Sequence, residues 1–406
     1  MYKLLKADLH LHTLYSDNID KLDSDDYAKL GDKYGYDVLA LTDHHYCLKN
    51  GNWDKLYKKI DDDKRIIKGY ELTFLNGHML VIGKENYDVG KTHEAIKEMY
   101  NSENIRILAH PDYNIWSWKR NMVPEINGIE VINDMVYWKQ PGKYTGIKSY
   151  RKYLLMKQKV SPFANTDCHR KVDFGRVWTG IYVKDNENAL DAIKRNRTFA
   201  TTGRISLEFQ SDDGYIMGDT ILGNENKLYW TAKDAEEVMI YNGDMIIEKS
   251  HKNCGYITPT VNGPYWIVAR KGCEMAMSSP IWVEGIETKS DEVFNLIRKN
   301  SFLCKLNKRL NCMLELLFEF QVHDNVWKDY YSWLKKFSLE RLEIEDLAGK
   351  SYDIAYNETK RRLLTAIRVA KGFMIYIINH YIENKTLLTK LLSYIMPQHT
   401  FENIMD

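Results

Sequence analysis

The sequence lacks several features that would place it in a familiar class of protein. Its six cysteines include no CxxC pair, so we expect reduced thiols and no thiolate metal site. The 57 basic and 56 acidic residues leave a formal charge of +1, without the basic excess of a general nucleic-acid-binding protein. The first residues carry no apolar signal stretch, and the run GFMIYIINHYI is too short to span a bilayer. We therefore expect a cytoplasmic protein with no membrane segment and no strong nucleic-acid signal.

Proline is nearly absent from the last third of the chain. None occurs between Pro280 and Pro397, and leucines and aromatic residues recur there at helical spacing. Residues 287–406 are therefore predicted to be an all-α domain. Residues 201–286 differ, because glycine-containing turns separate short runs such as RISLEFQ and YWIVARK. That pattern predicts a small β-sandwich.

The first 200 residues alternate between apolar runs and helix-like stretches. Helices are expected at 23–34, 91–101 and 187–196, among strand candidates such as DVLALTDH, HMLVIG and RILAHPD. Repeated β–α alternation predicts an α/β fold over residues 1–200, with a mainly parallel sheet or a barrel. The polar residues of these runs fall at the C-terminal ends of the strands, which is where α/β barrels carry their chemistry.

Histidines and carboxylates gather at these predicted strand ends. Eight of the twelve histidines lie within the first 170 residues. His10 and His12 lie two apart on a strand and point to one face, and the same holds for Asp167 and His169 in TDCH. Further clusters are TDHH, GYELTFLNGH and AHPD. Unpaired charges are costly inside a barrel, so converging imidazoles and carboxylates indicate bound cations.

Taken in order, the motifs HLHTLYSD, TDHH, GYE, GH, AHP and TDCH resemble those of the PHP (polymerase and histidinol phosphatase) superfamily. The segments NRTFATTGRISLEF, MGD and MAMSSPIWVE also resemble the CehA/McbA-type metallohydrolases, which extends the match to about residue 285. The resemblance implies a distorted seven-stranded, TIM-like (β/α) barrel at 1–200, followed by the β-sandwich at 201–286. The helical region at 287–406 resembles no domain that we recognise.

The resemblance also implies a cluster of two or three divalent metal ions. By motif position, the implied ligands are His10, His12, Glu71 and Asp167 for the first ion; Glu71, His78 and His110 for the second; and Asp17, His44 and His169 for the third. Nitrogen and oxygen donors without thiolate suit manganese, iron or zinc.

PHP proteins are metal-dependent phosphoesterases. The resemblance therefore implies hydrolysis of a phosphate mono- or diester, such as a nucleotide, an oligonucleotide or a sugar phosphate, by a metal-bridging hydroxide. One alternative is an amide, ester or carbamate metallohydrolase. The other is a non-catalytic PHP scaffold that binds partners through the helical tail. Two further possibilities stay open, which are that residues 287–406 form a homo-oligomer or that they bind a partner protein.

Two residues that flank His44 are further candidates for the site. Asp43 could accept a proton from a ligand histidine, as carboxylates behind metal ligands do, or it could cap the strand. His45 could contact substrate or donate a proton, and the alternative is a solvent-facing position in a loop.

Three arginines are candidates for binding a phosphate. Arg170 and Arg176 follow the TDCH motif directly, and Arg120 lies in a loop after another strand end. A guanidinium group matches phosphate oxygens with two parallel hydrogen bonds. The alternative for each is an ordinary surface salt bridge. Glu130 and Asn133 could reach the mouth of the barrel, where Glu130 is expected to line the pocket or bond to backbone, with direct metal binding as the alternative. His93 is expected to lie on a helix, at the surface or in the core.

Overall fold

The computed structural model describes residues 2–57, 65–74, 77–83, 91–112, 125–135, 146–223 and 226–286, with residues 357, 360, 361, 364, 367 and 368. The chain divides into two compact units, Met1–Ile286 and Glu287–Asp406. The all-α domain predicted for 287–406 lies almost entirely outside the described residues, so its helical fold and its role in binding partners stay predictions.

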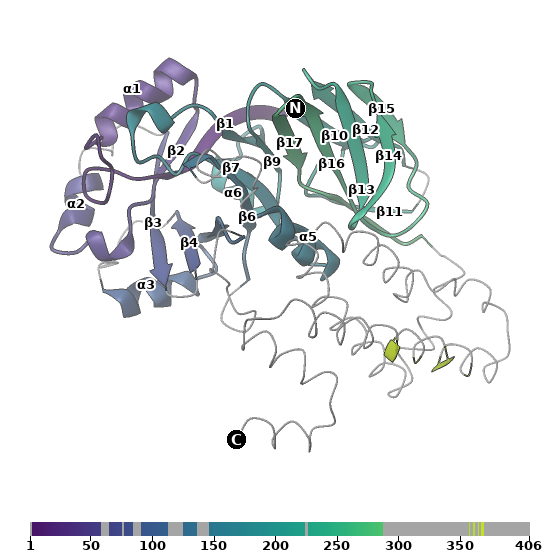
Figure 1. The fold of residues 1–406 in the computed structure, drawn as a ribbon, viewed down its shortest axis with the longest axis horizontal. Helices are drawn as coiled ribbons and strands as arrows, with labels where there is room; N and C mark the ends of the chain where they lie inside the picture. Colours follow the sequence, from purple (N-terminus) through teal and green to yellow (C-terminus); the bar gives the residue numbers. More distant parts are fainter. Residues whose placement is uncertain are drawn as a thin grey trace, which may run out of the picture. The chain divides into compact units, whose positions relative to one another are not determined.

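The first unit has a mixed α/β fold built mainly from strands, which confirms the expected class for the described residues (Figure 1). Strands β1 to β7 follow one another in chain order along the main sheet. Their bounds are β1 Tyr2–Leu11, β2 Val38–Leu41, β3 Ile66–Phe74, β4 Gly77–Ile82, β5 Ile105–Ala109, β6 Gly128–Asn133 and β7 Ser161–Asn165. Strands β1, β2 and β3 are parallel, as are β5, β6 and β7, whereas β4 runs antiparallel to both of its neighbours.

Short helices lie between the strands of this unit. Their bounds are α1 Ser24–Tyr34, α2 Asn52–Tyr57, α3 Thr92–Met99, α5 Ile147–Leu155 and α6 Ala189–Lys194, with 3₁₀ turns at η1 His45–Cys47 and η3 Lys171–Asp173. The helices expected at 23–34, 91–101 and 187–196 are thus confirmed as α1, α3 and α6. None of the helices in the described ranges combines the length and the apolar character needed to cross a membrane.

The local sequence fixes both ends of α1. The Asp23 carboxylate accepts a hydrogen bond from the backbone of Asp26 at 3.0 Å, and Asp26 accepts one from the backbone of Asp23 at 3.1 Å, which is a capping box. Gly35, at φ 69°, ends the helix in the left-handed region that glycine adopts without strain. The fixed register places the Tyr27 hydroxyl where it donates to the carbonyl of His12 at 2.6 Å. Helix α1 therefore supports the end of β1.

Strand β1 places apolar and polar side chains on alternate faces. Ala7, Leu9 and Leu11 belong to hydrophobic core clusters, whereas Asp8 and His10 point to the opposite face. All of these residues are fully buried. Both faces of the strand are therefore covered, and its polar face looks into the interior of the curled sheet.

The two ends of the β1–β7 run come together. Leu11 forms a parallel bridge with Cys168, whose backbone N–H donates to the carbonyl of His10 at 3.3 Å. The side chain of Asn165, at the end of β7, accepts a hydrogen bond from Leu9 at 2.9 Å. The sheet is therefore curled, and it brings the C-terminal ends of β1 and β7 side by side. The regular seven-stranded PHP barrel stays a prediction.

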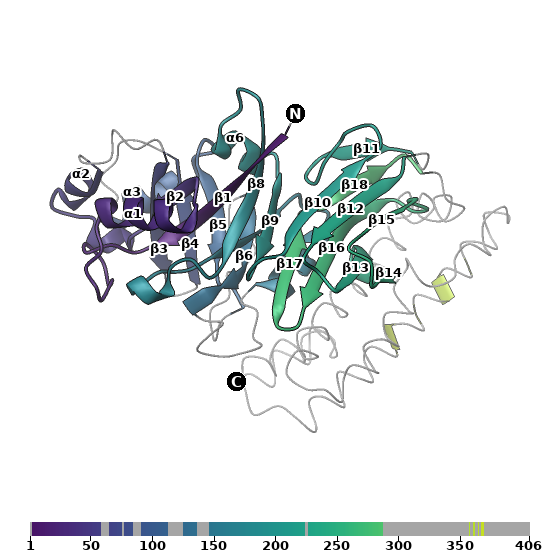
Figure 2. The ribbon, with the colours of Figure 1, turned by 90° about the horizontal axis from the view of Figure 1, so that it is seen from above.

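The main sheet continues on the other side of β1, into strands that follow β7 in the sequence. Strand β8 pairs antiparallel with β1 and β9, and β9 pairs with β17. The bounds are β8 Trp178–Lys184, β9 Thr198–Thr201, β11 Thr220–Leu222, β13 Glu237–Asn242, β14 Met245–Ser250, β16 Gly263–Lys271, β17 Glu274–Ser278 and β18 Ile281–Glu284. Figure 2 shows β8 and β9 between the β1–β7 part and the later strands.

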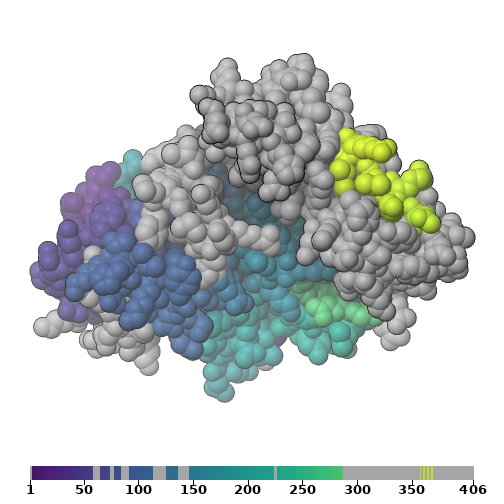
Figure 3. Space-filling view, turned by 90° about the horizontal axis from the view of Figure 1, so that it is seen from below, coloured from purple at the N-terminus to yellow at the C-terminus, as the bar shows by residue number. Residues whose placement is uncertain are grey.

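Three strands form a separate antiparallel sheet, β10 Ser206–Ser211, β12 Leu228–Lys233 and β15 Cys254–Ile257. One apolar core cluster joins this sheet to the main one, since it contains Leu207 and Trp230 from the small sheet and Ile267 and Ala276 from the large one. In Figure 3, purple and blue residues from the N-terminal end of this unit lie on the left, and teal and green residues from later in its sequence lie at its centre and lower right. Separate domains at 1–200 and 201–286 stay a prediction, because the main sheet runs through both ranges.

Candidate metal centre

The nine implied ligands are linked through three carboxylates. Asp167 lies within 3.4 Å of histidine nitrogens from His10, His12 and His169. Glu71 lies within 3.5 Å of the nitrogens of five histidines, which are His10, His12, His44, His78 and His110. Asp17 lies within 3.5 Å of His12, His44 and His169. The structure therefore brings all nine side chains to one place.

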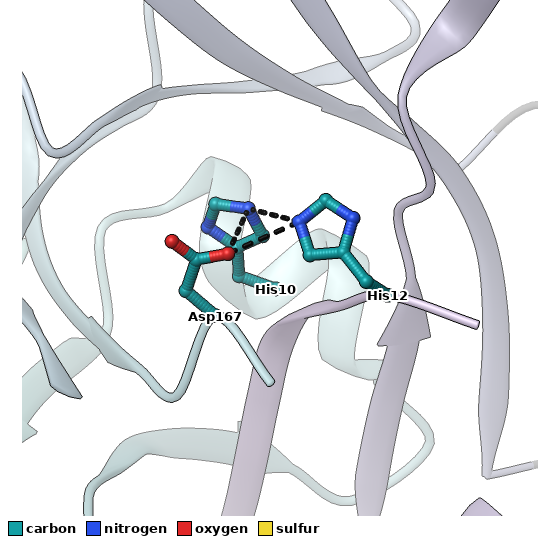
Figure 4. A group of neighbouring side chains, drawn as sticks. All are labelled: His10, His12 and Asp167. Carbon is teal, nitrogen blue, oxygen red and sulfur yellow. Dashed lines mark hydrogen bonds and ion pairs between the residues drawn. The ribbon is translucent and has the colours of Figure 1, made fainter. Parts of the chain in front are cut away.

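The first group lies deepest and is drawn in Figure 4. The Oδ1 atom of Asp167 lies 3.3 Å from Nε2 of His10 and 3.0 Å from Nε2 of His12, and the two nitrogens are 3.2 Å apart. The Oε1 atom of Glu71 lies 3.5 Å from Nε2 of His10, and its Oε2 atom lies 3.5 Å from Nε2 of His12. Strand alternation aims both imidazoles at the two carboxylates, as their spacing predicts.

The antiparallel strand β4 completes the second group. Because β4 runs against β3 and β5, its N-terminal end lies beside their C-terminal ends, and His78 pairs in register with Ala109. The Nδ1 atom of His78 lies 2.7 Å from Oε1 of Glu71, and Nε2 of His110 lies 3.5 Å from the same oxygen. A histidine at the start of a strand thus joins ligands at the ends of other strands.

The third group lies nearest the surface. Asp17, in the loop after β1, has an Oδ2 atom 2.9 Å from Nε2 of His169 and 3.5 Å from Nε2 of His44. Half of the Asp17 side chain is exposed, against none of the His12 side chain and 3% of the Asp167 side chain. The cluster therefore opens to solvent on the Asp17 side.

The charges of the cluster keep its buried carboxylates ionised. Burial raises the pKa of Glu71 and of Asp167, but nearby histidines, His10 foremost, hold both pKa values well below their usual range. Burial lowers the pKa of His44, yet Glu71 and Asp17 raise it to about 11. In the metal-free protein, protons on the imidazoles thus neutralise the negative charge of the carboxylates. Bound cations could neutralise the same charge instead.

The donor atoms fit shared cations. His10, His12 and Asp167; His12, Asp17 and His44; and Glu71, His78 and His110 each offer ligand atoms within 4.8 Å of one another. Two atoms that each lie about 2.1 Å from one tetrahedral ion are roughly 3.4 Å apart. The first group matches that spacing with separations of 3.0–3.5 Å.

Asp43 bonds to the loop after β1. Its Oδ1 atom accepts the backbone N–H of Thr13, and its Oδ2 atom accepts the Thr13 hydroxyl, both at 2.7 Å. Burial raises the pKa of Asp43 to about 6. These bonds support the strand-capping alternative and hold Thr13 directly after His12, while the catalytic role stays a prediction.

His45 does not face solvent, because only 2% of the residue is exposed. Its Nδ1 atom accepts the backbone N–H of Thr73 at 3.3 Å, and Nε2 lies 3.4 Å from the Thr92 hydroxyl. Burial lowers the pKa of His45. The neutral tautomer with a proton on Nε2 satisfies both contacts, and a substrate contact stays a prediction.

Arg170 and Arg176 share one buried carboxylate. Arg170 donates two hydrogen bonds to Asp173, at 3.0 and 2.9 Å, and Arg176 donates a third at 2.9 Å. The Nε atom of Arg176 also lies 2.8 Å from the buried Asp134. Both guanidinium groups thus neutralise acidic residues beside the site, and phosphate binding by them stays a prediction. Arg120 lies outside the described residues.

We expect Arg176→Ala to lower the free energy of unfolding by about 1–3 kcal/mol, because Asp134 and Asp173 both lose an ion pair with it. Urea unfolding followed by circular dichroism measures this difference. As a control, Arg195→Ala removes an exposed guanidinium that pairs with Glu187 at 3.2 Å, and should change stability by under about 0.5 kcal/mol. Equal stability of the two variants would contradict a structural role for Arg176.

Three polar residues that support the ligands have only a weak sequence signal. Asp8 accepts bonds from the backbone and hydroxyl of Thr166, and burial raises its pKa to about 7. Its spacing of two from His10 and four from His12 is the one signal that could have found it. Asn165 and Asn133 bind other carboxylates of the interior, and nothing in the sequence marks Asn165.

Comparison with known proteins leaves the family open. No family model matches the chain, and no curated protein matches it. A solved two-domain protein from Bacteroides vulgatus, named as containing a predicted PHP-like metal-dependent phosphoesterase, aligns over 70% of this chain and 88% of its own, at 15% identity and a TM-score of 0.38. PsfC from Pseudomonas syringae aligns over 48% and 89%, at 14% identity and a TM-score of 0.33. These TM-scores are too low to establish a shared fold, so only the geometry of the site bears on function.

Proposed function

We propose that this protein is a metal-dependent phosphoesterase of the PHP superfamily that acts on a small phosphorylated substrate. One observation carries the proposal. Nine motif residues, spread along the sequence from His10 to His169, lie in one cluster in which three carboxylates contact six imidazoles. A purely structural core would not need six imidazoles and three carboxylates in one place, because each charge is costly to bury.

Within this proposal, the three groups hold two or three ions of manganese, iron or zinc. Bound divalent ions would polarise phosphoryl oxygens and lower the pKa of a bound water toward neutrality. The chain itself supplies a rigid frame, since strand ends position His10, His12 and Asp167 in a water-poor interior. Asp17 and His169, on the open side, lie where substrate would approach.

The proposal favours phosphoesters over the amide, ester or carbamate alternative on grounds of charge. Several cations side by side attract an anionic group and leave its oxygens able to bridge them. Arg170 and Arg176 already bind Asp173, so the ions themselves would hold most of the phosphate charge. A nucleotide, an oligonucleotide or a sugar phosphate fits this requirement equally.

A hydrolysis panel tests the proposal. Protein loaded with manganese, iron or zinc is assayed on an aryl phosphate monoester, an aryl phosphodiester and an aryl carboxylate ester, beside elemental analysis. We expect bound metal and turnover of a phosphoester, both lost in His10→Ala and Asp167→Ala. His93→Ala is the matched control, because the His93 side chain is 75% exposed on α3.

Four outcomes would contradict the proposal. Protein without divalent metal, or hydrolysis unchanged in both ligand variants, would remove the metal centre from the reaction. Turnover of the carboxylate ester alone would instead favour the amide, ester or carbamate hydrolase. Metal-replete protein that hydrolyses none of these ester classes would favour the scaffold, which binding of a partner by residues 287–406 would support.

A further inference from the structure

Glu130 lies on β6 behind the deepest group of implied ligands, with no exposed surface. Its Oε1 atom lies 3.1 Å from Nδ1 of His10 and accepts a hydrogen bond from Asn165 at 3.0 Å. Its Oε2 atom accepts the backbone N–H of His110 at 2.9 Å and the amide of Asn133 at 3.0 Å. One carboxylate thus connects β1, β5, β6 and β7.

These partners of Glu130 are all donors. The backbone nitrogen of His110 can only donate. The amide orientation of Asn165 is fixed, because its oxygen accepts a backbone N–H of β1. The amide nitrogen of Asn133 also donates to Oδ2 of Asp167 at 3.0 Å, which fixes its orientation as well. An ionised carboxylate, which has acceptor oxygens only, satisfies this environment, whereas a carboxamide of the same size does not.

The contact with Glu130 determines which nitrogen of His10 is available to a cation. Because Nδ1 donates its proton to Glu130, Nε2 is the nitrogen whose lone pair a cation would take. That nitrogen faces Asp167 at 3.3 Å and Glu71 at 3.5 Å. A carboxylate behind a ligand histidine fixes the orientation of the ring and makes the facing nitrogen more basic.

We propose that Glu130 is a positioning residue of the metal centre, acting on three ligands from the side away from the ions. It orients the ring of His10, fixes the backbone of His110, and reaches Asp167 through Asn133. Its own oxygens serve these donors rather than a metal ion. This inference rests on the proposed function, because it requires that His10, His110 and Asp167 bind metal.

Glu130→Gln tests the inference, because it keeps the side-chain size and places an amide N–H₂ against donors. We expect the dissociation constant for Co²⁺, measured by competition with a chelator, to rise about 10- to 100-fold. We also expect the visible absorption of the Co²⁺-loaded protein to change, since the His10 ring loses its orientation. Glu98→Gln is the matched control, because Glu98 is also buried and accepts from Asn101 and Asn104, on α3 away from the ligands. It should leave both readouts unchanged.

A second variant covers loss of folding in Glu130→Gln. Glu130→Asp keeps a side chain with acceptor oxygens only. If Glu130→Gln folds, Glu130→Asp should bind Co²⁺ more tightly than Glu130→Gln does. If Glu130→Gln does not fold, Glu130→Asp should still fold and bind Co²⁺. The inference is overturned if folded Glu130→Gln matches the wild type in affinity and spectrum, or if Glu130→Asp binds no more tightly than Glu130→Gln. If the wild-type protein itself binds no Co²⁺, the proposed function fails as well, so the two failures are distinguishable.

Discussion

Glu71→Gln is expected to reduce hydrolysis to the rate of a protein-free solution and to empty two of the implied metal positions together. Glu71 is the carboxylate shared between the group of His10 and His12 and the group of His78 and His110. The substitution keeps the volume of a side chain that is 1% exposed, but removes its negative charge and turns one acceptor oxygen into a donor.

Elemental analysis beside a phosphoester assay measures this result. Glu98→Gln again supplies the control, because it replaces a buried carboxylate that contacts asparagine amides instead of histidines. Loss of one metal with the other retained would show that Glu71 is not shared. Wild-type metal content and rate would remove Glu71 from the centre altogether.

The sequence was sufficient to predict that the implied ligands come together. His10 and His12, two apart on an apolar strand, point to one face because a strand has a period of two, and the structure confirms this. His110 directly follows β5, and His44 and Asp167 come shortly after the ends of β2 (Leu41) and β7 (Asn165). Those predictions need only the local sequence pattern and the rule that the C-terminal ends of parallel strands lie at one edge of the sheet. They need no knowledge of how residues far apart in the sequence pack.

The supporting contacts could not be predicted in the same way. Glu130 bonds to His10 across 120 residues, and Asp8 bonds to Thr166 across 158 residues. Such pairs depend on the register and curl of the whole sheet, which no local pattern encodes. The antiparallel direction of β4 is likewise a tertiary feature, because the run HMLVIG has the same composition in either direction. The pairing of Arg176 with Asp134 and Asp173 depends on the turn at η3 and the end of β6.

Removal of metal is expected to lower the melting temperature of the protein by at most about 8–16 °C for each ion bound at a thousand times its dissociation constant. Binding to the folded state alone contributes about 4.1 kcal/mol at that concentration. Each kcal/mol shifts the melting temperature by about 2–4 °C for a chain of about 150–250 residues, and somewhat less for a longer one. The effect has a local cause. Once the ions are removed, only protonated imidazoles neutralise the negative charges of Glu71, Asp167 and Asp17.

Calorimetry of the full chain with and without a chelator measures this shift, and added Mn²⁺ or Zn²⁺ should restore it. The full chain is the right sample, because the measurement then does not require residues 1–286 to fold on their own. Asp167→Ala should melt at the same temperature with and without chelator if its carboxylate is needed to hold the ions. A chelator-dependent shift that persists in Asp167→Ala would place the stabilising metal elsewhere, whereas no shift in the wild type would show that the cluster is satisfied by protons alone.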